Sequence, residues 1–384
     1  MESSPSRPKT ALVGLTVIVL LAYFVWSREA EQRAHRDARI RAAALTYSAR
    51  MPQGVQPHAP LLGDSVHGEA IENYGRAVAL CGAALPCGDD STDPWALSQL
   101  AELPPDIARR LAKYEPALDA LATGAAAATI DLAAARRPLT VRSPGPTDFP
   151  FVANLVTLAA LVVRHELASG NGSAAVRRTA DLMTLQLDFL RGTASAFELL
   201  AAEGVTSVCC TWIDDRIASL DEPNRAALRD LLARFDAALP PIQRSFEGDL
   251  TLAARWLDRD DRERDHVSPP LLAAIVASIE RLASSEAAPW SVRRQALVAQ
   301  APTLAYPEAP DFAAVETARR TATAHLRLLI VALGHHLGEP LPSLRDPLGD
   351  GDLEVERPDA STIVVRSAGL APDGKRIERT AKRR

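Results

Sequence analysis

The sequence predicts a mainly α-helical protein that is anchored in a membrane by one N-terminal helix and ends in a small β-hairpin. Three observations support this fold class. An uncharged apolar run lies near the N-terminus, apolar residues recur at helical spacing through most of 65–338, and polar and apolar residues alternate around residue 355. No repeat of a known solenoid period is present, so we expect a bundle of helical hairpins or an irregular helical array.

The membrane segment is expected at residues 10–26, TALVGLTVIVLLAYFVW, which contain no charge. Seventeen helical residues span about 25 Å, the short end of what crosses a bilayer core. Tyr23 and Trp26 lie at its downstream end, where aromatic rings favour the headgroup zone. Because Arg7 and Lys9 precede the run, a cleavable signal peptide is the alternative, but no A-x-A cleavage site follows.

Charges on the two sides of this segment predict opposite orientations. Five arginines in residues 28–41 favour a cytoplasmic body. A short N-terminal tail with two cations is a common start for an exported body, and the cysteines suggest an oxidising compartment. We expect a single-pass protein of the bacterial inner membrane, with a signal-anchor and a periplasmic body. Of the 43 basic residues 39 are arginine, which is typical of GC-rich bacterial genomes.

The cysteines fall into two pairs. Cys81 and Cys87 enclose the tight loop CGAALPC and are candidates for a short disulfide in an oxidising compartment. A metal site would need CxxC spacing or a neighbouring histidine, and this loop has neither. Cys209 and Cys210 are adjacent in the apolar stretch EGVTSVCCTWI, where we expect two small buried side chains. Pairing between the two sets is left open.

Composition shifts and proline-rich connections divide the chain into seven expected segments. They are a cytoplasmic N-tail (1–9), the transmembrane anchor (10–26), a juxtamembrane helix and Pro-rich linker (27–64), an N-terminal helical unit (65–140), the main helical domain (141–338), a β-hairpin (339–374) and a basic tail (375–384).

Two apolar stripes at helical spacing are the clearest signals within the main domain. Their members are Val176, Ala180, Met183, Leu187 and Leu190 in the first, and Leu228, Leu231, Leu232, Phe235 and Leu239 in the second. We expect each stripe to face the core of the bundle.

Net charge and motifs restrict the classes of function. A net charge of -5 argues against a dedicated nucleic-acid binder. The sequence has no P-loop, no G-x-S-x-G and no G-x-G-x-x-G after a strand. We therefore expect an interaction or scaffold protein of the cell envelope that has an unidentified protein partner and no cofactor. The alternative is a helical envelope hydrolase whose site is assembled from residues distant in sequence, and a pocket containing His165 or the acids near residue 260 would favour it.

The C-terminal region resembles that of the type II secretion pseudopilins over about 50 residues. In that family a helix leads to an Asp-Pro segment, a two-stranded hairpin and a closing Gly-x-Asp-Gly turn. The matching features here are Asp346-Pro347, strands around Val355 and Val364, and the turn at 369–374. The N-terminal region departs from the family, because Val19 stands where the family has its assembly glutamate. The whole chain is more similar to larger uncharacterised helical proteins of bacteria with an N-terminal anchor. A link to secretion or pilus-like machinery is what the resemblance implies.

Some pseudopilins bind calcium in the loop beside this hairpin, and the resemblance extends to candidate ligands here. Four carboxylates supply hard oxygen atoms of the kind that calcium prefers, and glycines between them permit a tight wrap. They are Asp346, Asp350, Asp352 and Glu354. The spacing is not that of an EF-hand, and an ordinary acidic turn is the alternative.

Overall fold

In a computed structural model, helices make up most of the molecule, as expected. The structure describes residues 54–81, 106–131, 149–192, 216–244, 288–300, 312–371 and 374–383, together with scattered positions in 27–46, 203–213 and 282–284. None of the helices in these parts combines the length and apolarity that crossing a membrane requires. The anchor expected at 10–26 lies outside the described residues.

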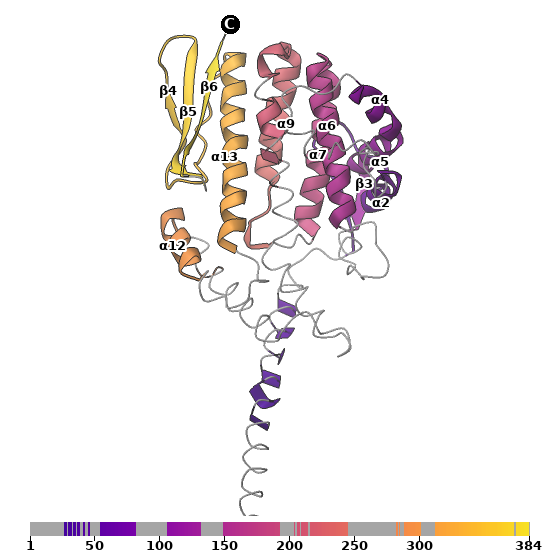
Figure 1. Ribbon diagram of the computed structural model, residues 1–384, viewed down its shortest axis with the longest axis vertical. Helices are drawn as coiled ribbons and strands as arrows, with labels where there is room; N and C mark the ends of the chain where they lie inside the picture. Colours follow the sequence, from indigo (N-terminus) through magenta and orange to yellow (C-terminus); the bar gives the residue numbers. More distant parts are fainter. Residues whose placement is uncertain are drawn as a thin grey trace, which may run out of the picture.

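Four long helices form the centre of the molecule and run side by side (Figure 1). They are α6 (Phe149–Ala168), α7 (Gly172–Gly192), α9 (Glu222–Ala238) and α13 (Phe312–Leu337). A small sheet covers α13 on one side, and a small α/β unit covers α6 and α7 on the other. The short helix α12 (Trp290–Gln300) contacts α13, and the 3-10 turn η3 (Ile217–Ser219) precedes α9.

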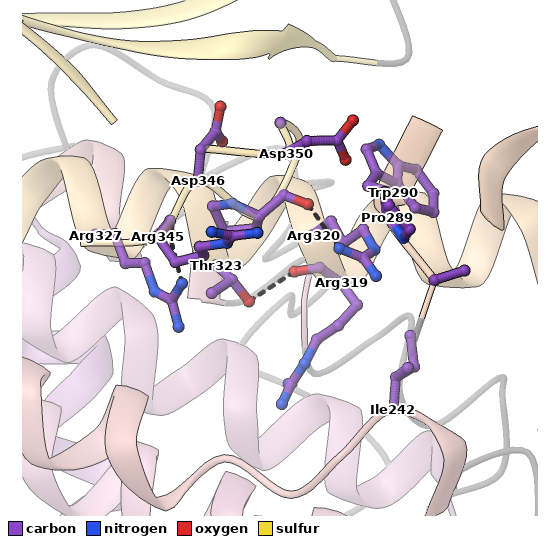
Figure 2. A pocket seen from close by; sticks show the side chains of 13 residues that line it. Ile242, Pro289, Trp290, Arg319, Arg320, Thr323, Arg327, Arg345, Asp346 and Asp350 are labelled. Atoms are coloured by element: carbon purple, nitrogen blue, oxygen red, sulfur yellow. Dashed lines mark hydrogen bonds between the residues drawn. The ribbon is translucent and has the colours of Figure 1, made fainter. Parts of the chain in front are cut away.

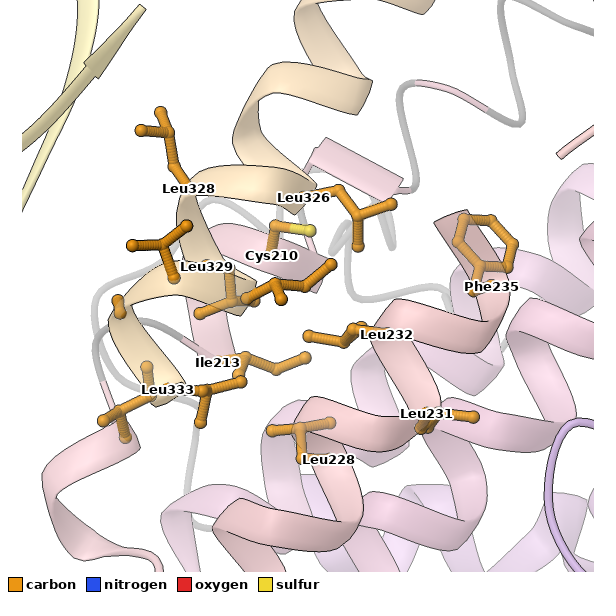
Figure 3. Packing of buried hydrophobic residues seen from close by; sticks show 14 of the residues in the cluster. Cys210, Ile213, Leu228, Leu231, Leu232, Phe235, Leu326, Leu328, Leu329 and Leu333 are labelled. Carbon is orange, nitrogen blue, oxygen red and sulfur yellow. The ribbon is translucent and has the colours of Figure 1, made fainter. Parts of the chain in front are cut away.

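Both predicted stripes are confirmed. All five members in α7 are buried, as are the first four in α9, while Leu239 is partly buried. In Figure 3, Leu228 and Leu232 of α9 extend toward the α13 residues Leu329 and Leu333, while Leu231 points to the other side of α9 within the same cluster. Residues three and four apart share one helix face, so each stripe forms a continuous apolar contact.

The N-terminal unit contains a sheet that the sequence did not predict. Its helices are α2 (Ala70–Cys81), α4 (Ile107–Leu111) and α5 (Glu115–Ala125), with the 3-10 turn η1 (Ala112–Tyr114) between the last two. Its strands are β1 (Val55–Pro57), β2 (Val66–Glu69) and β3 (Ala127–Asp131). β3 is central, antiparallel to β1 and parallel to β2. β1 lies in the segment expected to be a linker, and β2 and β3 lie in the unit expected to be helical. Strands of three to five residues carry too little alternation to be recognised from sequence.

The segment expected to be a linker is held to the bundle by a buried polar network. His58 is 6% exposed, and its Nε2 lies 2.9 Å from Oδ2 of Asp188 in α7. Its Nδ1 lies 2.7 Å from the carbonyl oxygen of Ala127 in β3. The hydroxyl of Tyr74 in α2 donates to the same Asp188 oxygen at 2.7 Å. Three separate segments are thus joined through one carboxylate.

The C-terminal sheet has three strands where a two-stranded hairpin was predicted. They are β4 (Glu354–Glu356), β5 (Thr362–Leu370) and β6 (Arg376–Lys382), paired antiparallel in that order. β6 lies in the region expected to be a basic tail over 375–384, and its residues alternate between exposed and buried. Ile377 and Ala381 face the core against α13, so the tail is a strand with a charged outer face.

Two hydrophobic clusters meet at α7. Met183 and Leu187 belong to the cluster shared with α9, α13 and the C-terminal sheet. Leu182 and Leu185 belong to the cluster shared with α2, α5 and α6. Because one helix contributes to both clusters, the N-terminal unit and the bundle pack as one body.

Candidate functional site

An arginine-lined cleft of about 400 Å³ lies between α12, α13 and the loop that precedes β4 (Figure 2). Four arginines and two aspartates contribute to its walls, which also contain Trp290 and Ile242. The charged residues are Arg319, Arg320, Arg327, Arg345, Asp346 and Asp350.

One face of α13 supplies most of the positive charge. Arg320, Thr323 and Arg327 follow one another at steps of three and four, which places them on the same side of the helix. Arg319 lies beside Arg320 and is more deeply buried, with 7% exposure. The cleft therefore has a cationic wall whose spacing is fixed by the helix.

Arg320 is held in place by three different contacts. Its Nε and Nη2 donate to Oε1 of Glu316 at 3.0 and 2.9 Å. Its Nη1 donates to the carbonyl oxygen of Pro347 at 2.8 Å. The guanidinium also lies over the ring of Trp290, 4.2 Å from the centroid, a geometry that favours cation–π attraction. The side chain thus joins α12, α13 and the loop.

Glu316 is fully buried and forms an ion pair with a second arginine as well. Arg293 of α12, also buried, donates from Nε to both carboxylate oxygens of Glu316 at 2.7 and 2.8 Å. Its Nη1 donates to the carbonyl oxygen of Leu282 at 2.7 Å. A buried carboxylate between two guanidinium groups is well compensated, so α12 and α13 are linked through charge.

The two other arginines of α13 connect the cleft to more distant segments. Arg319 forms an ion pair with buried Glu203, whose pKa is raised because burial outweighs the effect of the guanidinium. Arg327 donates from Nε to both oxygens of Asp236 in α9 at 3.1 and 3.0 Å. It also donates from Nη1 to the carbonyl oxygen of Arg345 at 2.7 Å.

Asp350 joins the loop to α12 on the side of the cleft across from α13. It accepts hydrogen bonds from the hydroxyl of Ser291 at 2.7 Å and from the Ser291 backbone N–H at 3.4 Å. These bonds cap the first turn of α12 from the loop, and they lower the pKa of the Asp350 carboxyl. The capping bond holds the loop and α12 at a fixed separation.

Arg345 differs from the other three arginines because its side chain is exposed and, in the described part of the chain, no ion pair holds it. Guanidinium groups form paired, charge-assisted hydrogen bonds with carboxylates and phosphates. The cleft therefore offers a pre-positioned cationic surface, with Arg345 at its rim and Trp290 at its base, to an anionic group.

The structure does not gather the predicted calcium ligands around one point. Asp346 is 1% exposed and its oxygens accept from the backbone N–H groups of Leu348, Ala368 and Gly369 and from the hydroxyl of Ser367. These donors use the lone pairs that a metal would need. Asp346 thus pins the loop to β5.

The other three carboxylates have separate partners. Asp350 binds Ser291, Asp352 accepts from the hydroxyl of Ser343, and Glu354 lies 3.7 Å from Arg376. Among the residues that the structure describes, no group of three or more His, Cys, Asp or Glu side chains is placed to hold a metal ion. The loop is a hydrogen-bonded connection between α13 and the sheet.

The three cysteines that the structure describes are buried. Cys81 is a free cysteine in α2 whose pKa burial raises to about 11, and its expected partner Cys87 lies outside the described residues. Cys209 and Cys210 are 1% and 0% exposed, which confirms the expectation of small buried side chains. The two adjacent residues face different clusters, Cys209 the N-terminal one and Cys210 the C-terminal one.

A second cavity, of about 540 Å³, lies between α5, α6 and α7. Asp181 lines it, and burial raises the pKa of this carboxyl to about 6, against the opposing effect of Arg178 and Arg177. Glu166 lines the same cavity. Carboxyl groups with raised pKa values in cavities are found at acid–base sites.

The residues that the sequence suggested for a hydrolase site do not line either of the two cavities described above, as far as the structure describes them. His165 is half-buried in α6 next to Glu166, and the acids of 258–265 lie outside the described residues. The cleft residues Trp290, Arg320 and Arg345 were not identified from the sequence, because they are separated by tens of residues and match no motif. Comparisons with protein-family models, with curated proteins and with solved structures find no match to this chain.

Proposed function

We propose that this protein is a membrane-anchored interaction protein of the bacterial cell envelope, and that its arginine-lined cleft receives an acidic segment of a partner protein. The observation that carries the proposal is the convergence of four guanidinium groups and an aromatic ring in one cleft. Arginine and tryptophan are the side chains most enriched at energetically important contacts between proteins.

The electrostatics of the lining favour an anionic partner over a cationic one. Both aspartates of the cleft already accept hydrogen bonds from the protein, Asp346 from four donors and Asp350 from Ser291. Arg345 remains available at the rim in the described structure. An incoming carboxylate would therefore meet the N–H donors of Arg345, whereas an incoming cation would find Asp346 buried behind four donors and Asp350 already bound to Ser291.

The ion pairs behind the cleft support a binding role through rigidity. Arg293, Arg319, Arg320 and Arg327 each bind a carboxylate from the same or a neighbouring element. A surface whose side chains are already fixed loses less conformational entropy when a partner binds. The cleft is thus organised before any partner arrives.

The anchor and the compartment complete the proposal. Residues 10–26 would hold the protein in the inner membrane, with residues 1–9 in the cytoplasm and the body in the periplasm. The resemblance of the C-terminal region to pseudopilins supports a partner within secretion or pilus-like machinery. The three-stranded sheet lies directly against α13, which carries the cleft.

The test is binding of a short fluorescein-labelled poly-glutamate peptide to the full-length chain in neutral detergent, followed by fluorescence anisotropy. A poly-glutamine peptide of equal length is the comparison. We expect the glutamate peptide alone to bind, and its affinity to fall as salt is added, because salt screens exposed charges.

A charge-reversal pair shows whether the cleft is responsible. Arg345→Glu should weaken binding by roughly tenfold or more, since it replaces an attraction with a repulsion at the rim. Arg357→Glu is the matched control, because this exposed arginine lies in the β4–β5 connection, outside the cleft. Equal binding by the two variants would contradict the proposal.

The alternative function, a helical envelope hydrolase, is favoured by one observation. Asp181 has a pKa of about 6 in a cavity that it shares with Glu166, so it can exchange a proton near neutral pH. Hydrolysis of a chromogenic ester that is abolished by Asp181→Asn would favour this alternative.

A further inference from the structure

A third cavity, of about 360 Å³, lies at the end of the bundle where the chain has its C-terminus (Figure 1). The first turn of α9, the last turn of α13 and the residue after β6 meet there. The lining consists of Ala218, Glu222, Arg225, His336, Leu337 and Arg383. The described helical positions between 27 and 46 lie beyond the opposite end of the body.

The positive charge in this cavity is not compensated as it is in the cleft of Figure 2. The Nε of Arg225 is buried and has no hydrogen-bond partner in the described structure. No ion pair between described residues engages Arg225 or Arg383, and the lining contains a single acid, Glu222. A buried N–H without a partner is costly, so such groups in native proteins call for an explanation.

The backbone at Gly338 helps to position the guanidinium of Arg383, the second arginine of this cavity. Gly338, directly after α13, has a φ of +71°, and a Cβ there would lie 2.5 Å from Nη2 of Arg383. The side chain of Arg383 therefore lies against the glycine, where a larger residue would displace it. The backbone N–H of Arg383 donates to the carbonyl oxygen of Ser361 at 2.7 Å. This bond holds the end of β6 beside the start of β5.

We propose that this cavity binds a phosphoryl or sulfuryl oxyanion, carried by a soluble ligand with a small organic part. Two guanidinium groups and an imidazole provide donors for the oxygens of such a group. The volume leaves room beside the anion for a further small group. Because the site lies at the end away from the N-terminal segment, a soluble source is favoured over a lipid headgroup.

His336 gives the site a pH dependence. Its pKa is lowered by burial, by Arg225 and by His335, so the imidazole is neutral at neutral pH. The other charged groups around it are Glu222 from α9 and Arg383 after β6. A bound anion favours the protonated imidazole, so binding takes up a proton and strengthens as the pH falls.

The experiment is isothermal titration of the full-length chain in neutral detergent with inorganic phosphate, and separately with sulfate, at constant ionic strength set by chloride. Arg383→Gln changes an exposed side chain and should leave the fold intact while weakening phosphate binding by roughly tenfold. Arg225→Gln should have a similar effect. Arg357→Gln is the matched control and should bind as the unmodified chain does.

Sulfate serves for the pH series because its charge is constant between about pH 6 and 8. We expect its affinity to increase as the pH is lowered, and His336→Gln to remove the increase. Added phosphatidylglycerol should not compete with phosphate. Competition would contradict the soluble source. Two results would overturn the proposal: phosphate binding no stronger than that of chloride, or equal phosphate binding by Arg383→Gln and the unmodified chain. Either result would show that the cations of the cavity interact only with the negative C-terminal end of the α13 dipole.

Discussion

A single carboxylate oxygen, Oδ2 of Asp188, accepts hydrogen bonds from His58 and Tyr74 in the interior of the protein. All three side chains are almost completely buried. A buried carboxylate is stable only when donors satisfy it, so His58 and Tyr74 together compensate the burial of Asp188 in α7. The contact between His58 and Asp188 could not be predicted from the sequence, because 130 positions separate the two residues.

The ionisation of His58 should make stability depend on pH. Burial lowers its pKa, but the hydrogen bond and charge of Asp188 more than offset this, so the pKa is raised above 6.5. A raised folded-state pKa adds stability that is fully present below pH 6.5 and is lost as the pH rises through the folded value. We expect His58→Gln to cost about 2 kcal/mol at pH 6 and less at pH 8.

Urea unfolding between these pH values measures the effect. Tyr74→Phe is the control, because it removes one donor to Asp188 without removing a group that titrates near neutrality. Its cost should be the same at both pH values. A pH-independent cost for His58→Gln would show that folding leaves the pKa of His58 unchanged, and a cost larger at pH 8 than at pH 6 would show that folding lowers it.

At the scale of elements, apolar spacing predicted the long helices well and the short strands poorly. The stripes of α7 and α9 are long enough for the helical period to be unambiguous. β6 was missed because its sequence, RIERTAK, is dominated by charge, and only Ile377 and Ala381 mark its buried face. Arg379 shares that face, which masks the alternation.

Substitutions on the two faces of β6 test whether it is a strand. Ala381 is 4% exposed and faces α13, so Ala381→Asp would bury an unpaired charge and cost roughly 3 kcal/mol or more. Thr380 is exposed on the outer face, and Thr380→Asp should change stability little. Thermal unfolding of both variants is the measurement. Equal, small effects would mean that 375–384 is a solvated tail after all.

At the scale of the whole molecule, the candidate site is assembled by the tertiary structure. Trp290, Arg320 and Arg345 come from α12, α13 and the following loop, and only their packing brings them into one cleft. The sequence could supply the helix that spaces Arg320 and Arg327, but not the approach of α12 to it. The carboxylates singled out as calcium ligands likewise have partners that only the tertiary structure brings near, since Asp346 turns inward to bind β5.

The proposed anchor and periplasmic body are tested most directly by locating the C-terminus relative to the inner membrane, since the proposed envelope partner requires an extracytoplasmic cleft. Alkaline phosphatase, and separately a fluorescent protein, would be fused to the C-terminus of the full-length chain. We predict phosphatase activity without fluorescence. Fluorescence without phosphatase activity would place the cleft in the cytoplasm and contradict the proposed function, showing that the arginines of 28–41 decide the topology.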